Sequence, residues 1–247
     1  MITTLESTIS QETLAECVRD LVGGIPGRPA ISNEFYDRRT PATAGVRRTV
    51  HGSYMNASVM VALSVLNTEN LEARVECVRN LYSEYGNGDA SKAHLVPLEN
   101  FFADMLSRAS GATVTSADMH AAERLPTTAA FSAGQRELFT SDDQRTVQGA
   151  LMAQEHLAYS TLNRLYEGTR NYKHLYDNDD AFHEACEYFY IHIGEAEKEH
   201  KAEAIAPASA VCQSEADFDV VAAGFNRFMD LTARYWAGVN TAMLQAG

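Results

Sequence analysis

The sequence predicts an all-α protein in which a single domain is built as a bundle of about seven helices. Apolar residues recur at intervals of three and four along most of the chain, which is the period of an amphipathic helix. No convincing run alternates apolar and polar residues as a β-strand does. The 247 residues, 45% of them hydrophobic, suffice for one full core, so we treat residues 1–247 as one domain.

The first predicted helices are separated by glycine and proline. An amphipathic helix over residues 10–22 ends at a Gly-Gly-Ile-Pro-Gly segment, and we expect an irregular segment up to residue 52 to pack with it on the bundle. Further helices are predicted over residues 54–66, 68–85 and 89–107. Thr68 is the expected N-cap of the second of these, Gly86 its expected end, and Pro97 an expected kink in the third. The predicted buried stripe of the second consists of Leu71, Val75, Val78, Leu81 and Tyr82.

The second half of the chain is predicted to hold longer helices. A short helix over 116–123 starts at Ser116, and another helix covers 127–139. Three long helices follow over residues 142–172, 179–204 and 214–245. Ser141 or Asp142 caps the first of them. The apolar stripe of the last consists of Phe218, Val221, Phe225, Phe228, Leu231 and Tyr235.

The composition excludes several functional classes. A formal net charge of −13 disfavours binding to nucleic acid or to an anionic membrane. The four cysteines form no CxxC motif, so zinc-ribbon and thioredoxin-type sites are excluded, and scattered thiols fit a reducing compartment. No apolar run approaches the roughly 20 residues that span a bilayer. The N-terminus shows no signal peptide, so we expect a cytoplasmic protein.

Potential metal ligands gather on the predicted helix around residue 190. The sequence Phe-Tyr-Ile-His-Ile-Gly-Glu-Ala-Glu-Lys-Glu-His places Glu197 three positions before His200, so both side chains can share one helical face. His192 lies about two turns earlier and is somewhat rotated from that face. A π-bulge near Gly194 would bring His192 into line.

Two further segments carry residues of the same kind. Glu84 closes one predicted helix, a Gly-Asn-Gly turn follows, and His94 lies in the first turns of the next helix, so this corner can aim both side chains at a shared point. Glu155 has apolar or small neighbours at helical spacing, so it could face the core. A buried carboxylate requires a partner, which a metal ion would supply. Imidazole and carboxylate ligands in this mixture suit iron or manganese.

Each of these residues also has a plain structural interpretation. Glu197 and His200 lie in a charged run that a solvated helix face would explain. Glu84 and His94 could flank a turn, and Glu155 could be an exposed helix acid. His192 could be a core histidine with its hydrogen bonds satisfied. Their joint order along the chain is what favours a metal site.

That order resembles the haem-oxygenase-like diiron oxidases, over residues 82–204. The segment EYGNGDASKAH resembles the family's first signature, in which Glu and His lie ten positions apart, as Glu84 and His94 do. Glu155 matches the second signature, because a Gly-Thr-Arg-Asn-Tyr stretch follows about thirteen residues later. FYIHIGEAEKEH fills the place of the last, a His-x3-Asp-x2-His helix. Here the interval between histidines is one residue longer and the acid is Glu, so Glu195 is an alternative to Glu197.

The resemblance implies a haem-oxygenase-like fold without haem. It implies two Fe(II) ions as cofactor, O2 as co-substrate, and the following ligands: Glu84, His94, Glu155, His192, Glu197 and His200. Family reactions include N-oxygenation and oxidative C–C cleavage or rearrangement, often in natural-product biosynthesis, so we expect a small, amino-acid-derived substrate. Arg170 at a pocket rim and Tyr159 in its wall are candidate substrate-binding residues. A homodimer is a candidate assembly.

Two other functions stay open at this point. A cofactor-independent enzyme of the same helical superfamily, such as a thiaminase-type hydrolase or a pyrroloquinoline quinone synthase, would need a catalytic Cys or a basic pocket. Cys186 is the only thiol close in sequence to the proposed site helix. A non-enzymatic helical interaction protein would use its acidic surface to bind a partner.

Overall fold

The computed structural model describes residues 57–193 and 204–246, and no β-strand occurs within these two ranges. The all-α prediction is confirmed there, with more helices than the seven expected. The predicted helix over 10–22, and its packing with the segment up to residue 52, lie outside the described residues. No helix within the described ranges has both the length and the apolar character needed to cross a bilayer.

The first described helices form a hairpin whose exposed face differs from the prediction. These are α4 (Ala57–Leu66) and α5 (Leu71–Glu84), which pack against each other. The N-cap of α5 is Asn70, because its side chain accepts the backbone N–H of Ala73. Thr68 donates instead to the Ser64 carbonyl. The predicted stripe of α5 is largely exposed, with Leu71 at 72%. The opposite face is buried, and it consists of Ala73, Cys77 and Asn80.

The helix predicted to begin by Asp89 begins later. Two short 3-10 turns, η2 (Gly86–Gly88) and η3 (Ala90–Lys92), precede α6 (Leu95–Ser110). Pro97 lies in the first turn of α6, where its missing N–H costs no helical hydrogen bond, so it starts the helix and does not kink it.

Two helices then lead to the long central helix. These are α7 (Ser116–His120), which Thr115 caps through a capping box with Asp118, and α8 (Pro126–Phe139). The central helix is α9 (Gln144–Thr169), whose N-cap is Asp143, one residue after the predicted positions. A 3-10 helix, η4 (Arg170–Leu175), takes up the rest of the predicted range.

The helix predicted over 179–204 is not continuous. It is divided into α10 (Asp179–Ala185) and α11 (Glu187–Ile193), with Cys186 between them. Residues 204–210 are helical again, and α13 (Glu215–Ala246) agrees with its predicted range. Phe182 and Phe189, on either side of the break, are both buried in the core, and no glycine or proline within residues 179–193 marks the break in the sequence.

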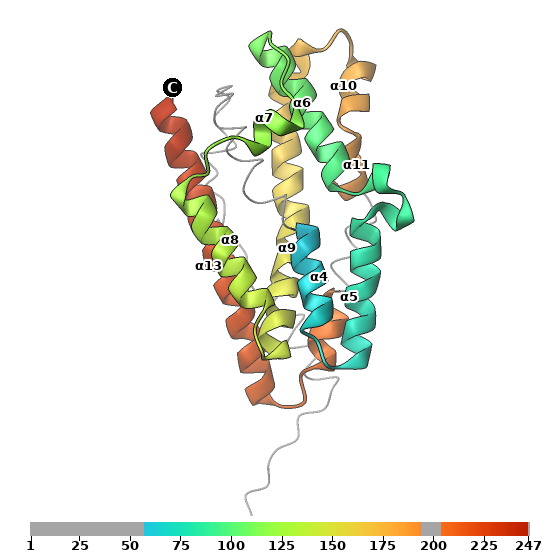
Figure 1. The fold of residues 1–247 in the computed structure, drawn as a ribbon, viewed down its shortest axis with the longest axis vertical. Helices are drawn as coiled ribbons and strands as arrows, with labels where there is room; N and C mark the ends of the chain where they lie inside the picture. Colours follow the sequence, from blue (N-terminus) through green and yellow to red (C-terminus); the bar gives the residue numbers. More distant parts are fainter. Residues whose placement is uncertain (1–56, 194–203, 247) are drawn as a thin grey trace, which may run out of the picture.

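The central helix α9 positions the site. It packs against α13 and α8 along one side and against α11 and α4 along others (Figure 1). Gly149 permits the close approach of α9 to α13, because a Cβ at this position would lie 2.1 Å from the Val221 carbonyl oxygen. Acids and histidines on α5, α6, α9 and α11 are thereby directed toward the interior of one bundle.

Candidate metal centre

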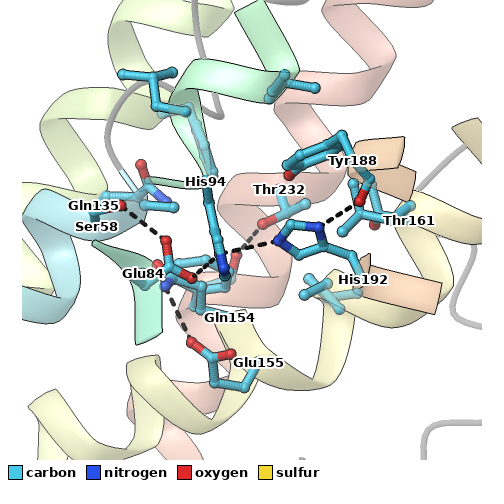
Figure 2. Close-up of a pocket in the computed structure, with 18 of the residues that line it drawn as sticks. Ser58, Glu84, His94, Gln135, Gln154, Glu155, Thr161, Tyr188, His192 and Thr232 are labelled. Atoms are coloured by element: carbon cyan, nitrogen blue, oxygen red, sulfur yellow. Dashed lines mark hydrogen bonds and ion pairs between the residues drawn. The ribbon is translucent and has the colours of Figure 1, made fainter. Parts of the chain in front are cut away.

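A cavity of about 110 Å³ lies inside the bundle and contains the predicted ligands that the structure describes. Glu84, His94, Glu155 and His192 all line it. In Figure 2 the side chains of Glu84, His94 and His192 point toward one another, and Glu155 lies nearby beside Gln154. Four residues that span more than a hundred positions of sequence therefore meet in one place.

The corner between α5 and α6 holds Glu84 and His94 together. The backbone N–H of His94 donates to the Glu84 carbonyl at 3.0 Å, and the two side chains meet at 3.2 Å between Nδ1 and Oε1. Ser58 on α4 donates to the other Glu84 oxygen at 2.8 Å. Gly86 makes the turn, since its φ is +66° and a Cβ there would lie 2.6 Å from the Lys92 carbonyl carbon.

Gly86→Ala is expected to damage the site more than the fold. The added methyl must push Lys92 and Ala93 away, which separates His94 from Glu84 and adds the strain of a positive φ, about 1–2 kcal/mol. We expect at least about tenfold weaker metal binding, measured by titration of the chelator-treated protein. Gly111→Ala is the matched control, because Gly111 also has a positive φ but has nothing within 4 Å of its Cβ position. Equal metal affinity in both variants would contradict this role for the turn.

His192 is oriented by its own helix. Its Nδ1 lies 2.6 Å from the Tyr188 carbonyl oxygen, and because a carbonyl only accepts, Nδ1 carries the proton. Nε2 is then the atom that faces the site, 3.0 Å from His94 Nδ1. Histidine ligands commonly have one ring nitrogen bonded to a carbonyl in this way while the other binds the metal. His192 is 5% exposed and therefore faces the interior, and Gly194, near which the π-bulge was predicted, lies outside the described residues.

Glu155 supplies a second, more deeply buried carboxylate. It is 4% exposed, and it accepts hydrogen bonds from Asn80 and, at 3.4 Å, from Gln154. Burial, together with repulsion from the Glu84 charge, raises its pKa to about 7, although these hydrogen bonds act in the opposite direction. The prediction that Glu155 faces the core is confirmed.

The two acids have opposite electrostatics. Burial alone would raise the pKa of Glu84, but the hydrogen bond and charge of His94, together with the Ser58 hydroxyl, outweigh it and hold the pKa below the ordinary value. Glu84 is therefore the anionic member of the pair, whereas the raised pKa of Glu155 leaves its carboxyl group partly protonated at neutral pH. A cation between them would favour the charged form of both.

The donor chemistry fits iron. Within residues 57–193 and 204–246, no three His, Cys, Asp or Glu side chains already surround one point as a complete ion site. The separations of 3.0 and 3.2 Å are hydrogen-bond distances from His94 Nδ1, and two donors about 2.1 Å from one ion at right angles would lie a similar distance apart, about 3.0 Å. Two carboxylates and two imidazoles suit iron or manganese. A bound cation would also stabilise the ionised form of Glu155, whose burial is otherwise costly.

The remaining predicted residues are not among the described residues that line the cavity. Glu195, Glu197 and His200 lie outside the described residues. Arg170 is exposed and pairs with Glu167 at 3.0 Å, and the cavity lining does not include it among the residues described. Tyr159 is half-buried and is likewise outside that lining.

The thiol considered for a cofactor-independent reaction is not among the described residues that line the cavity. Cys186 is fully buried at the break between α10 and α11, and burial raises its pKa to about 11. A thiol with this pKa is almost entirely protonated at neutral pH and is a poor nucleophile.

Several cavity residues escape the sequence analysis. They are Ser58, Gln135, Gln154, Thr232 and Trp236. Gln135 follows Phe131 by four positions and Thr232 follows Phe228 by four, so each is a polar residue inside an apolar helical stripe. A buried polar residue in such a place is the signal that could have identified them.

The fold has counterparts among solved structures. A CADD-like protein of unknown function from Nostoc punctiforme has a TM-score of 0.69 and 17% identity, over 94% of this chain and 97% of that one. A domain of unknown function with a haem oxygenase-like fold from Shewanella denitrificans has a TM-score of 0.63 and 17% identity, over 97% and 96%. A TenA homologue from Pseudomonas syringae has a TM-score of 0.58 and 12% identity, over 93% and 90%. These similarities show the haem-oxygenase-like fold.

Sequence comparison identifies the family. A search of curated proteins found no significant match. Residues 46–233, about three quarters of the chain, match the model of a family described as iron-containing redox enzymes. The match spans Glu84, His94, Glu155 and His192. The chain therefore belongs to this family of iron-containing redox enzymes with a haem-oxygenase-like fold, as its motifs predicted.

Proposed function

We propose that this protein is a non-haem diiron oxygenase that uses O2 to oxidise a small, amino-acid-derived molecule, by N-oxygenation or by oxidative C–C cleavage or rearrangement. Natural-product biosynthesis is the proposed setting. Glu84, His94, Glu155 and His192 would hold iron together with Glu197, or Glu195 in its place, and His200. The supporting observation is the meeting of two acids and two histidines, from separate helices, in a single interior cavity.

The chain's own residues prepare the site for this chemistry. When bound, the iron supplies the redox equivalents that activate O2. Ser58 and the α5–α6 corner orient the Glu84 carboxylate, and the Tyr188 carbonyl fixes the tautomer of His192. Apolar side chains form much of the remaining wall and exclude water; they include Leu98, Phe131, Leu157, Leu162 and Phe228.

The proposal is tested by O2 uptake. Protein loaded anaerobically with Fe(II) is expected to consume O2 when mixed with its substrate from a panel of amino acids and amines, with an optical change in stopped-flow measurements. Protein loaded with Zn(II), which has no redox chemistry, is the control. If the protein binds iron but shows no O2 uptake and no optical change with any compound, the oxygenase proposal is refuted. Turnover of a substrate without metal would indicate the cofactor-independent alternative.

A further inference from the structure

The cavity has a second polar region that comes from different helices. Gln135 on α8 and Thr232 on α13 both line it. Neither helix contributes an acid or a histidine to the Glu84–His94–His192 group or to Glu155. The two helices pack against each other.

Gln135 carries a buried acceptor whose hydrogen bond is missing. The residue is 3% exposed, and within the described part of the chain its Oε1 has no hydrogen-bond partner. Leaving a buried polar atom unpaired is costly, and buried polar groups in proteins are generally satisfied. An amide oxygen can only accept, so the group that satisfies it must bring an N–H or O–H.

Thr232 presents the same kind of atom. Its hydroxyl donates to the Phe228 carbonyl at 3.0 Å, which uses its only hydrogen. Thr232 Oγ1 can therefore only accept a hydrogen bond from a ligand. Two neighbouring helices thus each offer an oxygen lone pair, and a ligand group with several N–H donors would match both.

The wall around this pair is aromatic. Phe131, Phe228 and Trp236 line the cavity on the same two helices. Phe131 is held by stacking on Tyr235, with ring centroids 5.0 Å apart, and by an edge contact with Phe228 at 6.1 Å. The faces of aromatic rings attract cations, Trp most strongly, and ammonium ligands are often recognised by such surroundings.

The acidic side chains of the cavity lining have no basic counterpart from Lys or Arg. Glu84 is its anionic carboxylate, Glu155 is a second carboxyl group with a raised pKa, and no Lys or Arg occurs among the described residues that line the cavity. A ligand cation is electrostatically compatible with these surroundings, and a ligand carboxylate would depend on bound metal for its counter-charge.

We propose that Gln135 and Thr232 form a recognition subsite for the amino group of a small, mainly apolar amine. The amino group is held as an ammonium ion by the two oxygens and by the aromatic wall of Phe228 and Trp236. This inference deepens the proposed function, since it names the substrate class of the same cavity. A volume of about 110 Å³ limits the bound part to a few carbon atoms, because a cavity of about 150 Å³ holds benzene.

Three probes of similar size separate the head groups: butylamine, 1-butanol and butyrate. Their binding is measured by ligand-detected NMR and calorimetry on chelator-treated full-length protein at pH 7, with and without Zn(II). Zinc offsets the charge of Glu84 and Glu155, so attraction to these acids is separated from recognition at Gln135. We expect butylamine to bind at least about tenfold more tightly than butyrate in both conditions.

Two substitutions test the subsite. Gln135→Met keeps length and volume but removes the acceptor, so it should weaken butylamine binding about tenfold. It should weaken 1-butanol binding less, because a neutral O–H makes a weaker hydrogen bond than an ammonium group, and leave butyrate, which has no donor, within about twofold. Q135E adds a negative charge at the same place and should tighten butylamine binding. Thr128→Val is the matched control, because Thr128 is also a buried polar residue of α8 but does not line the cavity. It should leave all three affinities unchanged.

Three results would each contradict the proposed subsite. A preference for butyrate, weaker butylamine binding in Q135E, or equal losses for all three probes in Gln135→Met would overturn it. The Q135E result keeps the test decisive if the Met variant does not fold. Because binding is measured without iron and without turnover, a failed oxygenase proposal would leave these affinities intact. Iron binding without any preference for butylamine would refute the subsite alone.

Discussion

Glu84→Gln is expected to abolish turnover, by more than about 100-fold, and to remove most of the bound iron. The substitution keeps the shape of the side chain but replaces an anionic donor with a neutral amide. It also weakens the contact with His94 Nδ1, now 3.2 Å from Glu84 Oε1. Iron content after anaerobic loading and desalting, and O2 consumption with substrate, measure the two effects.

The control for this prediction lies on the same helix. Glu76→Gln makes the identical change two turns earlier on α5, at a residue that pairs with Arg79 on the surface at 2.9 Å. It should retain iron and activity. Glu84→Gln protein that folds normally and still binds iron as wild type does would show that Glu84 is not a ligand.

Glu155→Gln is expected to change how stability depends on pH. The pKa of Glu155 rises from 4.5 to about 7 on folding, so between these values the folded state binds more protons than the unfolded state. The free energy of unfolding of the metal-free protein therefore falls as pH rises through this window. A shift of this size corresponds to at most about 3 kcal/mol, which Glu155→Gln should recover at pH 8. Glu84, with its lowered pKa, acts in the opposite sense, because its contribution is lost as pH falls through its folded-state pKa, below this window.

Urea unfolding of chelator-treated protein at pH 5 and pH 8 measures the effect. The wild type should lose stability between these two values, and Glu155→Gln should lose less. Glu167→Gln, an exposed change on the same helix, should behave as the wild type does. With Fe(II) bound, the trend for the wild type should reverse, because metal binding requires the deprotonated carboxylate. Identical pH profiles for the wild type and Glu155→Gln would contradict a carboxyl group that is neutralised by burial.

Elements with strong local signals could be predicted from the sequence. Pro126 begins α8 and Asp143 caps α9, and both helices lie within about two residues of their predicted starts. The buried face of α5 could not be predicted. An apolar stripe indicates that a helix has a preferred side, but not which neighbouring element covers that side. The break at Cys186 was missed because no glycine or proline marks it in the sequence.

The site shows the same division. The Glu84–His94 corner was predictable because a turn fixes two residues that are near in sequence. Gln135 and Thr232 interrupt apolar stripes, which indicates buried polar residues, but nothing local distinguishes one that lines a cavity from one that pairs within the core. Gln148 demonstrates the second case, since it is equally buried on α9 but donates to Thr68 at 2.7 Å.

The most direct test of the account is anomalous diffraction at the iron absorption edge, from crystals of the protein loaded anaerobically with Fe(II). We predict two strong peaks, with donor atoms from Glu84, His94, Glu155 and His192 each within bonding distance of at least one of them. An active crystal in which iron binds at another place, with these four side chains still bonded only to one another, would contradict it.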